Sequence, residues 1–467
     1  AMVFGLRCPH YLSFLPSRWL HGMLREDSGT SLFERALCRI FGDDCSIRPS
    51  IYRAFLGAQG FDVSSQSFTG HFYRGNRVLP RSSTNLSEVD VQIIGPFRRL
   101  LGLGESCRRL GEALRSTHWS INLVDYDVGM SRAAAVMRTD LGTPRPARIN
   151  ILHLNAEEIP EAIAYLPEIS AGSYIIVMPY WELNRPSAVH ALGLSLIDEI
   201  WVASSYLVRV FDNRRVPVVH VGISFKGLPA LPGERMKFRA KLGLRPSEFV
   251  FVTTSDALSW VQRKNVLGTI NAFQAAFTYN DAVRLIVKTH NLTTDLPTKQ
   301  KEVWSKISEL CAQDPRLILI NETFEPTEQN SLLAAGDCLV SLHRAEGLGL
   351  DILDALSAGM PIIVTAYSGN MDYCTTETAW LVEYDLVPVE IDEYAFVEAG
   401  HFWAEPRLAS AVLAMIDVYQ AGSIGRAAKT EAARALLGAN ASSKVVTSQI
   451  SARISALLEL SSEKAAN

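Results

Sequence analysis

The segment 341–373, SLHRAEGLGLDILDALSAGMPIIVTAYSGNMDY, contains the residues best suited to bind an anion beside a polyol. Glu346 and Asp354 are eight residues apart, and the loop between them contains Gly347 and Gly349. Glycine lets a backbone approach a ligand closely, and the helix expected directly behind the loop offers unpaired N–H groups. Such amides suit a phosphate, whereas carboxylates suit hydroxyl groups. The pattern therefore predicts a small pocket for a nucleotide diphosphate that carries a sugar; a solvated acid at an ordinary helix start is the alternative.

A second charged motif, Arg263-Lys264-Asn265, lies between a predicted strand and a predicted helix. Cations are unfavourable at the start of a helix unless an anion lies close by. Beside a diphosphate they would stabilise the negative charge that a leaving nucleotide gains as its bond to the sugar breaks. The alternative interpretation is an ordinary cationic helix start.

The elements that must position these residues follow from apolar runs typical of buried parallel strands. The runs alternate with helical stretches in two series, at 89–94, 121–124, 149–152, 174–178, 199–203 and 216–221, and at 249–254, 283–288, 317–321, 338–342, 361–365 and 379–382. A chain of 467 residues also exceeds one comfortable core. We therefore predict an α/β protein with two Rossmann-like, doubly wound domains that face a cleft.

The predicted boundaries divide the chain into four parts. We predict a mainly helical N-terminal extension at residues 1–84 and a first Rossmann-like domain at residues 85–225. Residues 226–440 are predicted to form the second Rossmann-like domain, and the final helix within 441–467 can cross back to the first domain.

The two charged motifs resemble those of retaining GT-B glycosyltransferases, especially the large bacterial group called family 4, or glycosyl transferases group 1. The resemblance spans roughly residues 89–382 and includes the acidic pair 346–354, the RKN element 263–265 and the SGN turn 368–370. This chain has Asp354 where the family usually has glutamate. The resemblance implies transfer of a hexose or deoxyhexose, with retention, from a nucleotide diphosphate sugar to a hydroxyl acceptor in bacterial polysaccharide, lipopolysaccharide or glycolipid assembly.

The resemblance also implies roles for individual residues. Glu346 would contact the donor sugar and Asp354 the ribose hydroxyls, while Lys264, assisted by Arg263, would neutralise the diphosphate. The remaining donor-binding positions implied are Gly347, Leu348, Gly349 and Leu350 in the acidic motif, Gly102 and Gly104 across the cleft, Phe324 beside the nucleotide base, and Asn370 in the SGN turn.

Three residues of the first domain complete the predicted site. His153 ends a strand at the expected cleft edge and is a catalytic candidate, although a lone histidine is more often structural. Trp181 and Glu182 resemble the WE element of the bacterial group. There Trp181 would stack on an acceptor sugar and Glu182 would orient its hydroxyls.

Composition and charge limit the classes of partner and the compartment that we expect for this protein. A net charge of −4 and a pI of about 6.3 give no support for nucleic acid. Seven scattered cysteines without metal-ligand spacing suggest reduced thiols in a cytoplasmic protein. The first residues lack the apolar run of a signal peptide or spanning helix, and peripheral association with the inner membrane remains open for the extension. Asp125-Tyr-Asp127 has the D-x-D form of a metal site but is interpreted as coincidence, so no metal or other cofactor is expected.

Two other functions fit the same fold. One is a nucleotide-sugar 2-epimerase, which needs acid and base groups that face the sugar. The other is a non-catalytic protein that binds nucleotide sugars or glycans. The partners expected for a transferase are a nucleotide-sugar donor and a glycan or glycolipid acceptor.

Overall fold

The computed structural model describes residues 89–126, 141–166, 169, 173–212, 216–225, 227, 233–293 and 296–466. It also describes four two-residue strands that pair as antiparallel hairpins, namely β1 (Glu26–Asp27) with β2 (Thr30–Ser31) and β3 (Phe61–Asp62) with β4 (Ser67–Phe68). The helices predicted for residues 1–84 concern residues outside the described part of the chain.

The first domain is built on a six-stranded parallel sheet in the order β10-β9-β8-β7-β5-β6. Its strands are β5 (Val91–Gly95), β6 (Ile121–Asp125), β7 (Ile149–Leu152), β8 (Tyr174–Val177), β9 (Glu199–Val202) and β10 (Val218–His220). Its helices are α5 (Gly102–Arg115), α6 (Ile159–Tyr165), α7 (His190–Ser195) and α8 (Ser205–Phe211). The strand order reverses between β5 and β7, and ligands bind open α/β sheets at such a switch point.

The second domain repeats this design, with the strand order β13-β12-β11-β14-β15-β16 and a switch point between β11 and β14. Its strands are β11 (Phe249–Asp256), β12 (Val283–His290), β13 (Leu317–Asn321), β14 (Cys338–Ser341), β15 (Ile362–Thr365) and β16 (Trp380–Val382). Its helices are α9 (Glu234–Lys241), α10 (Val261–Lys264), α11 (Val266–Ala276), α12 (Thr298–Gln313), α13 (Pro326–Ala335) and α14 (Leu350–Ser357), with a 3-10 turn at Gly369–Asp372. All predicted strands of both series are confirmed, within two residues at either end.

A hairpin that the sequence did not predict follows β16. Its strands, β17 (Tyr384–Pro388) and β18 (Phe402–Pro406), pair antiparallel. The loop between them reaches the first domain, where the Ser187 hydroxyl donates to the carbonyl oxygen of Phe396 at 2.6 Å. The hairpin thus closes one side of the gap between the domains.

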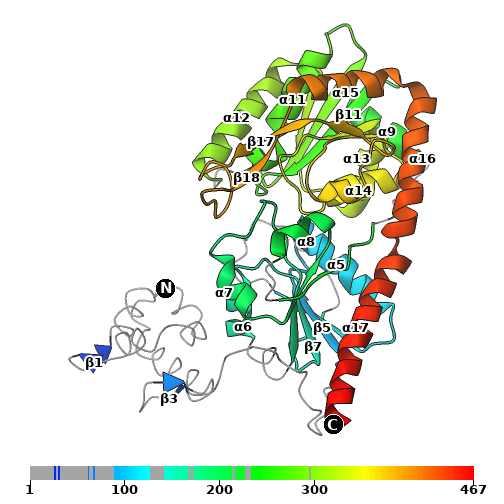
Figure 1. Cartoon of the computed structure of the whole chain (residues 1–467). Helices are drawn as coiled ribbons and strands as arrows, with labels where there is room; N and C mark the ends of the chain where they lie inside the picture. The colour runs from blue at the N-terminus through cyan, green and yellow to red at the C-terminus, as the bar shows by residue number, and fades with distance from the viewer. Residues whose placement is uncertain are drawn as a thin grey trace.

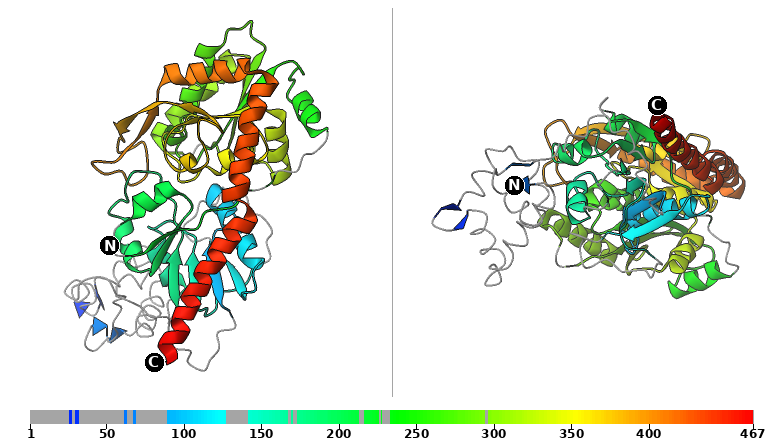
Figure 2. Two further views of the ribbon diagram at one scale, coloured as in Figure 1. Left: turned by 45° about the vertical axis from the view of Figure 1, so that its right-hand side comes forward. Right: turned by 90° about the horizontal axis from the view of Figure 1, so that it is seen from below.

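Three helices end the chain: α15 (Leu408–Gln420), α16 (Gly422–Asn440) and α17 (Ser443–Ala466). Figures 1 and 2 show α16 beside the second domain and α17 running along the first, where α17 packs against α5. Arg453 of α17 donates through both its Nε and Nη2 to the fully buried carboxylate of Glu199.

The described helices were also compared with the requirements for crossing a membrane. None of them is alone both long and apolar enough, although the bent pair Leu408–Gln420 and Gly422–Glu459 meets the length and composition criteria across a 110° bend.

Candidate active site

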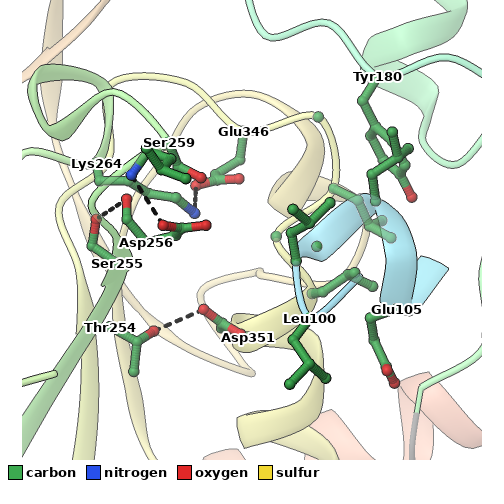
Figure 3. Close-up of a pocket in the computed structure, with 18 of the residues that line it drawn as sticks. Leu100, Glu105, Tyr180, Thr254, Ser255, Asp256, Ser259, Lys264, Glu346 and Asp351 are labelled. Atoms are coloured by element: carbon green, nitrogen blue, oxygen red, sulfur yellow. Dashed lines mark hydrogen bonds and ion pairs between the residues drawn. The ribbon is translucent and has the colours of Figure 1, made fainter. Parts of the chain in front are cut away.

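A cavity of about 650 Å³ lies between the two domains, at the carboxyl ends of both sheets. Loops after β5 and β8 line it from the first domain, and loops after β11, β12, β13 and β14 line it from the second. Both switch points therefore open onto one space. Figure 3 shows Lys264 and Glu346 on one wall and Tyr180 and Glu105 on the other.

Glu346 is the centre of a buried charge cluster. Lys264 Nζ donates to Glu346 Oε1 at 2.5 Å, and Arg263 Nη1 lies 3.1 Å from the same oxygen. Burial would raise the pKa of the Glu346 carboxyl, but Lys264 and Arg263 outweigh burial and lower the pKa to about 2. Glu346 is therefore ionised at neutral pH, and the three residues that the sequence placed together do meet.

Lys264 and Arg263 differ in their access to the cavity. The Lys264 side chain is 19% exposed, and its ammonium has three protons, so it can bind a second anion while it holds Glu346. The Arg263 side chain is 7% exposed, and its Nη1 also donates to the carbonyl oxygen of Ala345 at 2.9 Å. Arg263 therefore braces the acidic loop, whereas Lys264 presents charge to the cavity.

The cationic motif ends in asparagine because the backbone at Asn265 is left-handed. It adopts a left-handed conformation, with φ at 52°, which asparagine tolerates better than most residues. This turn ends α10 after Lys264 and begins α11, where Asn265 Oδ1 accepts a hydrogen bond from the Gly268 amide at 3.2 Å. The reversal leaves Lys264 at the end of a short helix, on the cavity wall.

The SGN turn supports the acidic loop from behind. The hydroxyl of Ser368 accepts from the Glu346 amide at 2.8 Å, and the Gly369 amide donates to the Glu346 carbonyl oxygen at 2.8 Å. A Cβ at Gly369 would lie 2.1 Å from the Gly347 carbonyl oxygen, so only glycine fits. Asn370 is fully buried and donates to Thr365 O. It lies behind the loop rather than on the cavity wall, where the sequence expected it to reach a donor.

The glycine-containing loop leads directly into α14. Gly347, Leu348, Gly349 and Leu350 all line the cavity. Gly349 has a φ of 85°, which favours glycine, and precedes the first helical residue. The first turn of α14 therefore begins at the cavity, with the unpaired amides of a helix N-terminus close to it.

Asp354 lines the same cavity but is bound by the other domain. Arg109 of α5 donates from Nη1 to Asp354 Oδ1 at 2.9 Å and from Nη2 to Asp354 Oδ2 at 2.5 Å. Arg109 also donates to Glu105 at 3.0 Å and to the Ser224 carbonyl oxygen at 3.2 Å. The ribose hydroxyls that the sequence assigned to Asp354 would have to compete with this two-pronged ion pair.

The two glycines at the start of α5 have different surroundings. Gly102 lines the cavity, and no atom lies within 4 Å of a Cβ placed there. Gly104 is buried, and its Cβ would lie 2.2 Å from the carbonyl oxygen of Arg99 and 2.7 Å from that of Pro96. Only Gly102 is therefore in the predicted position beside the cavity, whereas Gly104 lets α5 pack closely on the preceding loop.

His153 is fully buried and does not lie at the cavity surface, where the sequence placed it. Its Nδ1 lies 2.7 Å from Met178 O and therefore carries the proton, so Nε2 accepts from the Ser106 hydroxyl at 2.8 Å. The Ser106 oxygen in turn lies 2.9 Å from the hydroxyl of Tyr180, which lines the cavity. Burial lowers the pKa of His153 to about 4, so a neutral histidine fixes this chain of hydrogen bonds.

Trp181 and Glu182 line the cavity near the hairpin. Trp181 is 4% exposed, and its ring centroid lies 5.5 Å from that of Tyr394, a residue of the hairpin loop. The Tyr394 hydroxyl donates to Glu182, whose Oε1 also lies 3.7 Å from Arg263 Nη1. Trp181, Tyr394 and Glu182 thus form one side of the cavity, and Glu182 connects this side to the Glu346 cluster through Arg263.

The opposite end of the cavity combines an aromatic ring with a cation. Lys288 Nζ lies 4.4 Å from the ring centroid of Phe324 and donates to the Glu322 carbonyl oxygen at 2.7 Å. Burial lowers the pKa of Lys288 to about 8, which leaves the ammonium largely protonated at pH 7. A flat ring beside a fixed cation can hold a planar, electron-rich group such as a nucleobase.

The cavity residues that the sequence reasoning did not assign to the site include Arg109, Tyr180, Lys288, Asp351 and Tyr394. Lys288 could have been found because it stands near the end of a predicted strand, as His153 does. Asp351 lies inside the acidic motif itself. Arg109 and Tyr394 gave no local signal, since each acts through a contact with the other domain.

The predicted D-x-D element is only partly visible, because Asp127 lies outside the described residues. Asp125 accepts a hydrogen bond from the Arg98 amide at 3.1 Å. The cysteines within the described residues, Cys107, Cys311, Cys338 and Cys374, are all free.

No protein-family model matches this sequence, and no curated protein is similar to it. Solved structures do resemble its fold over 79% of the chain. They include HepE of Anabaena in complex with UDP and glucose (TM-score 0.56, 13% identity, 100% of that chain covered) and sucrose-phosphate synthase of Thermosynechococcus elongatus (0.57, 14%, 99%). A glycosyltransferase of Rickettsia africae is similar to the same degree (0.56, 12%, 99%). The two parallel six-stranded sheets and these likenesses establish the GT-B fold that the sequence predicted.

Proposed function

We propose that this protein is a retaining glycosyltransferase that moves a hexose or deoxyhexose from a nucleotide diphosphate sugar to a hydroxyl acceptor. The observation that carries the proposal is the Glu346–Lys264 pair beside the glycine loop 347–350, where a switch point opens onto the cavity between the domains. One place thus offers an ammonium and backbone amides for phosphates and an ionised carboxylate for sugar hydroxyls.

The size and polarity of the cavity suit such a donor. Its volume of about 650 Å³ lies within the range of small-molecule sites. Phe324 and Lys288 would border the nucleobase, Lys264 and the loop amides would hold the diphosphate, and Glu346 would hold the sugar. HepE, whose fold is similar, has been solved with UDP and with UDP-glucose, which supports a nucleotide-sugar donor here.

The charge on Glu346 bears on the mechanism. A carboxylate with a pKa of about 2, bound to two cations, is a weak base and a weak nucleophile. We infer a front-face substitution in which the acceptor hydroxyl attacks the anomeric carbon as the phosphate leaves, and its proton passes to the departing phosphate oxygen. Lys264 would stabilise the charge that the phosphate gains, and domain closure would exclude water that competes with the acceptor.

Several finer features belong to the same proposal. Lys264 provides positive charge at the diphosphate, so we propose that transfer needs no metal ion. We propose a glycan or glycolipid acceptor of bacterial polysaccharide or lipopolysaccharide assembly, bound beside Trp181 and Glu182. A cytoplasmic location, with the protein at the inner face of the membrane, remains a prediction.

The 2-epimerase alternative is less well supported. Such an enzyme needs acid and base groups that face the sugar, whereas His153 is buried behind the cavity wall and holds Ser106. A protein that binds nucleotide sugars without turnover remains a second candidate, because the pocket alone would satisfy it.

The proposal is tested by incubating the protein with radiolabelled UDP-, GDP- and dTDP-sugars, preselected by thermal shift, together with glycan acceptors. A transferase releases nucleotide and extends the acceptor with the retained anomeric configuration. An epimerised donor would establish the isomerase instead, and binding without turnover would establish the non-catalytic protein.

A further inference from the structure

Asp354, the carboxylate that the family resemblance assigns to the ribose, already forms an ion pair with the other domain. Arg109 of the first domain donates to both oxygens of Asp354, and the Arg109 side chain is only 5% exposed. Breaking a buried ion pair leaves an uncompensated charge, which costs more than a hydrogen bond to a hydroxyl returns. A ribose therefore gains nothing by displacing Arg109 from Asp354.

A second carboxylate stands on the same helix with its charge exposed. Asp351 lies in the first turn of α14, lines the cavity and is exposed to it. Its Oδ2 accepts from the Thr254 hydroxyl at 2.8 Å, which fixes the direction of the side chain, as Figure 3 shows. The carboxylate is thus oriented by the protein and still accessible to a ligand.

Asp351 and Asp354 lie close enough together on α14 for a ribose to bind at either carboxylate with only a small shift. Residues three apart lie on the same side of a helix, with Cβ atoms about 5–6 Å apart. A ribose held at Asp351 would therefore lie about one helical turn closer to the helix start than a ribose held at Asp354. That shift brings the nucleoside toward Thr254, on the strand next to the one that carries Lys288.

We propose that Asp351, not Asp354, binds the ribose hydroxyls of the donor, and that the Arg109–Asp354 ion pair is a structural joint between the domains. The proposal rests on the proposed function, since it assumes a nucleotide in this cavity. It specifies the donor further, because a carboxylate on the ribose favours ribonucleotides over deoxyribonucleotides. The Lys288 ammonium, whose largest favourable electrostatic partner is Asp351, limits the negative charge at this end of the cavity.

Calorimetric titration of the full chain with UDP, 2′-deoxy-UDP and 3′-deoxy-UDP tests the assignment, with the guanosine series as a second set. The wild type should bind the ribonucleotide roughly tenfold or more tightly than the deoxy form that lacks the bound hydroxyl. Asp351→Asn should bring this ratio close to one and leave the melting temperature unchanged. Asp354→Asn should keep the ratio and lower the melting temperature, because Arg109 loses its partner.

The outcomes separate this proposal from the broader one. Loss of the ratio in Asp354→Asn but not in Asp351→Asn overturns the assignment while the nucleotide site stands, as does an equal response of both variants. If Asp354→Asn does not fold, the double variant Arg109→Gln/Asp354→Asn removes both charges. This double variant must still bind the ribonucleotide more tightly than the deoxyribonucleotide. A wild type that binds no nucleotide of either series overturns the proposed function as well.

Discussion

At the scale of single residues, the site depends on the Glu346 carboxylate, which forms ion pairs with two neighbouring cations. Glu346 holds Lys264 at the cavity wall and pairs with Arg263 beneath it. The sequence predicted this group because the three residues belong to motifs with a clear chemical purpose. It could not predict that Arg263 would be almost fully buried, since burial depends on how the loops pack together.

We expect Lys264→Ala and Glu346→Ala each to reduce turnover by about 10²-fold or more, because each removes fixed charge at the reacting phosphate or sugar. Turnover of the donor is measured alongside circular dichroism, which should show an intact fold. Lys237→Ala is the matched control, because Lys237 is exposed and its ion-pair partner, Glu234, lies in its own helix away from the cavity. Wild-type rates in both site variants would remove the assigned site.

The buried His153 predicts a pH dependence of stability. Its pKa in the folded protein is lowered to about 4, whereas an unfolded histidine titrates near 6.5. Between these values the unfolded chain binds a proton that the folded protein does not, so stability falls as the pH drops from 6.5 to 4, by about 3 kcal/mol for this group. Urea unfolding at pH 7, 5.5 and 4 measures this loss of unfolding free energy, with His153→Asn as the comparison. A free-energy difference between wild type and variant that stays constant over this range would contradict the assignment.

At the scale of elements, the sequence predicted the strands of the two parallel sheets but missed the β17–β18 hairpin. The run 174–178 is apolar throughout, and Ile175, Ile176 and Val177 within it are fully buried, as expected of an inner parallel strand. The β17–β18 hairpin mixes charged and apolar residues, so its sequence resembles a loop. Its role is visible only in the structure, where Tyr394 reaches across to Glu182.

The start of α5 gives a matched pair of glycine substitutions. A methyl group at Gly104 would meet two backbone carbonyl oxygens within 2.7 Å, whereas at Gly102 it would meet nothing within 4 Å. We expect Gly104→Ala to lower the free energy of unfolding by about 1–3 kcal/mol and Gly102→Ala to leave it unchanged or slightly raised. Thermal or urea unfolding compares the two variants. Equal stabilities would mean that α5 does not pack on its preceding loop as described.

The α17 helix should stabilise the first domain through Arg453. This residue is the cationic partner of Glu199, which is fully buried and also accepts from Trp201 Nε1 at 2.7 Å. Arg453→Ala should cost about 2–4 kcal/mol of unfolding free energy, because a buried carboxylate loses its charge partner. Lys444→Ala, an exposed position on the same helix, should have little effect. A similar small change in both variants would contradict the stabilising role assigned to the Arg453–Glu199 ion pair.

At the scale of the whole molecule, the cavity exists because the two domains touch at several points around it. Besides the Arg109–Asp354 ion pair, the Ser204 hydroxyl donates to the Gly347 carbonyl oxygen at 2.6 Å. The Ser205 amide donates to Asp372 at 2.7 Å. The first domain therefore holds the glycine loop of the second. Sequence alone could not reveal these contacts, because they join residues more than 140 positions apart.

The most direct test is a crystal structure of the protein with the nucleoside diphosphate that stabilises it most. We predict that the diphosphate lies between the domains, with Lys264 and the amides of residues 347–350 as its partners. A nucleotide bound outside this cavity, or with its phosphates away from Lys264, would contradict the account.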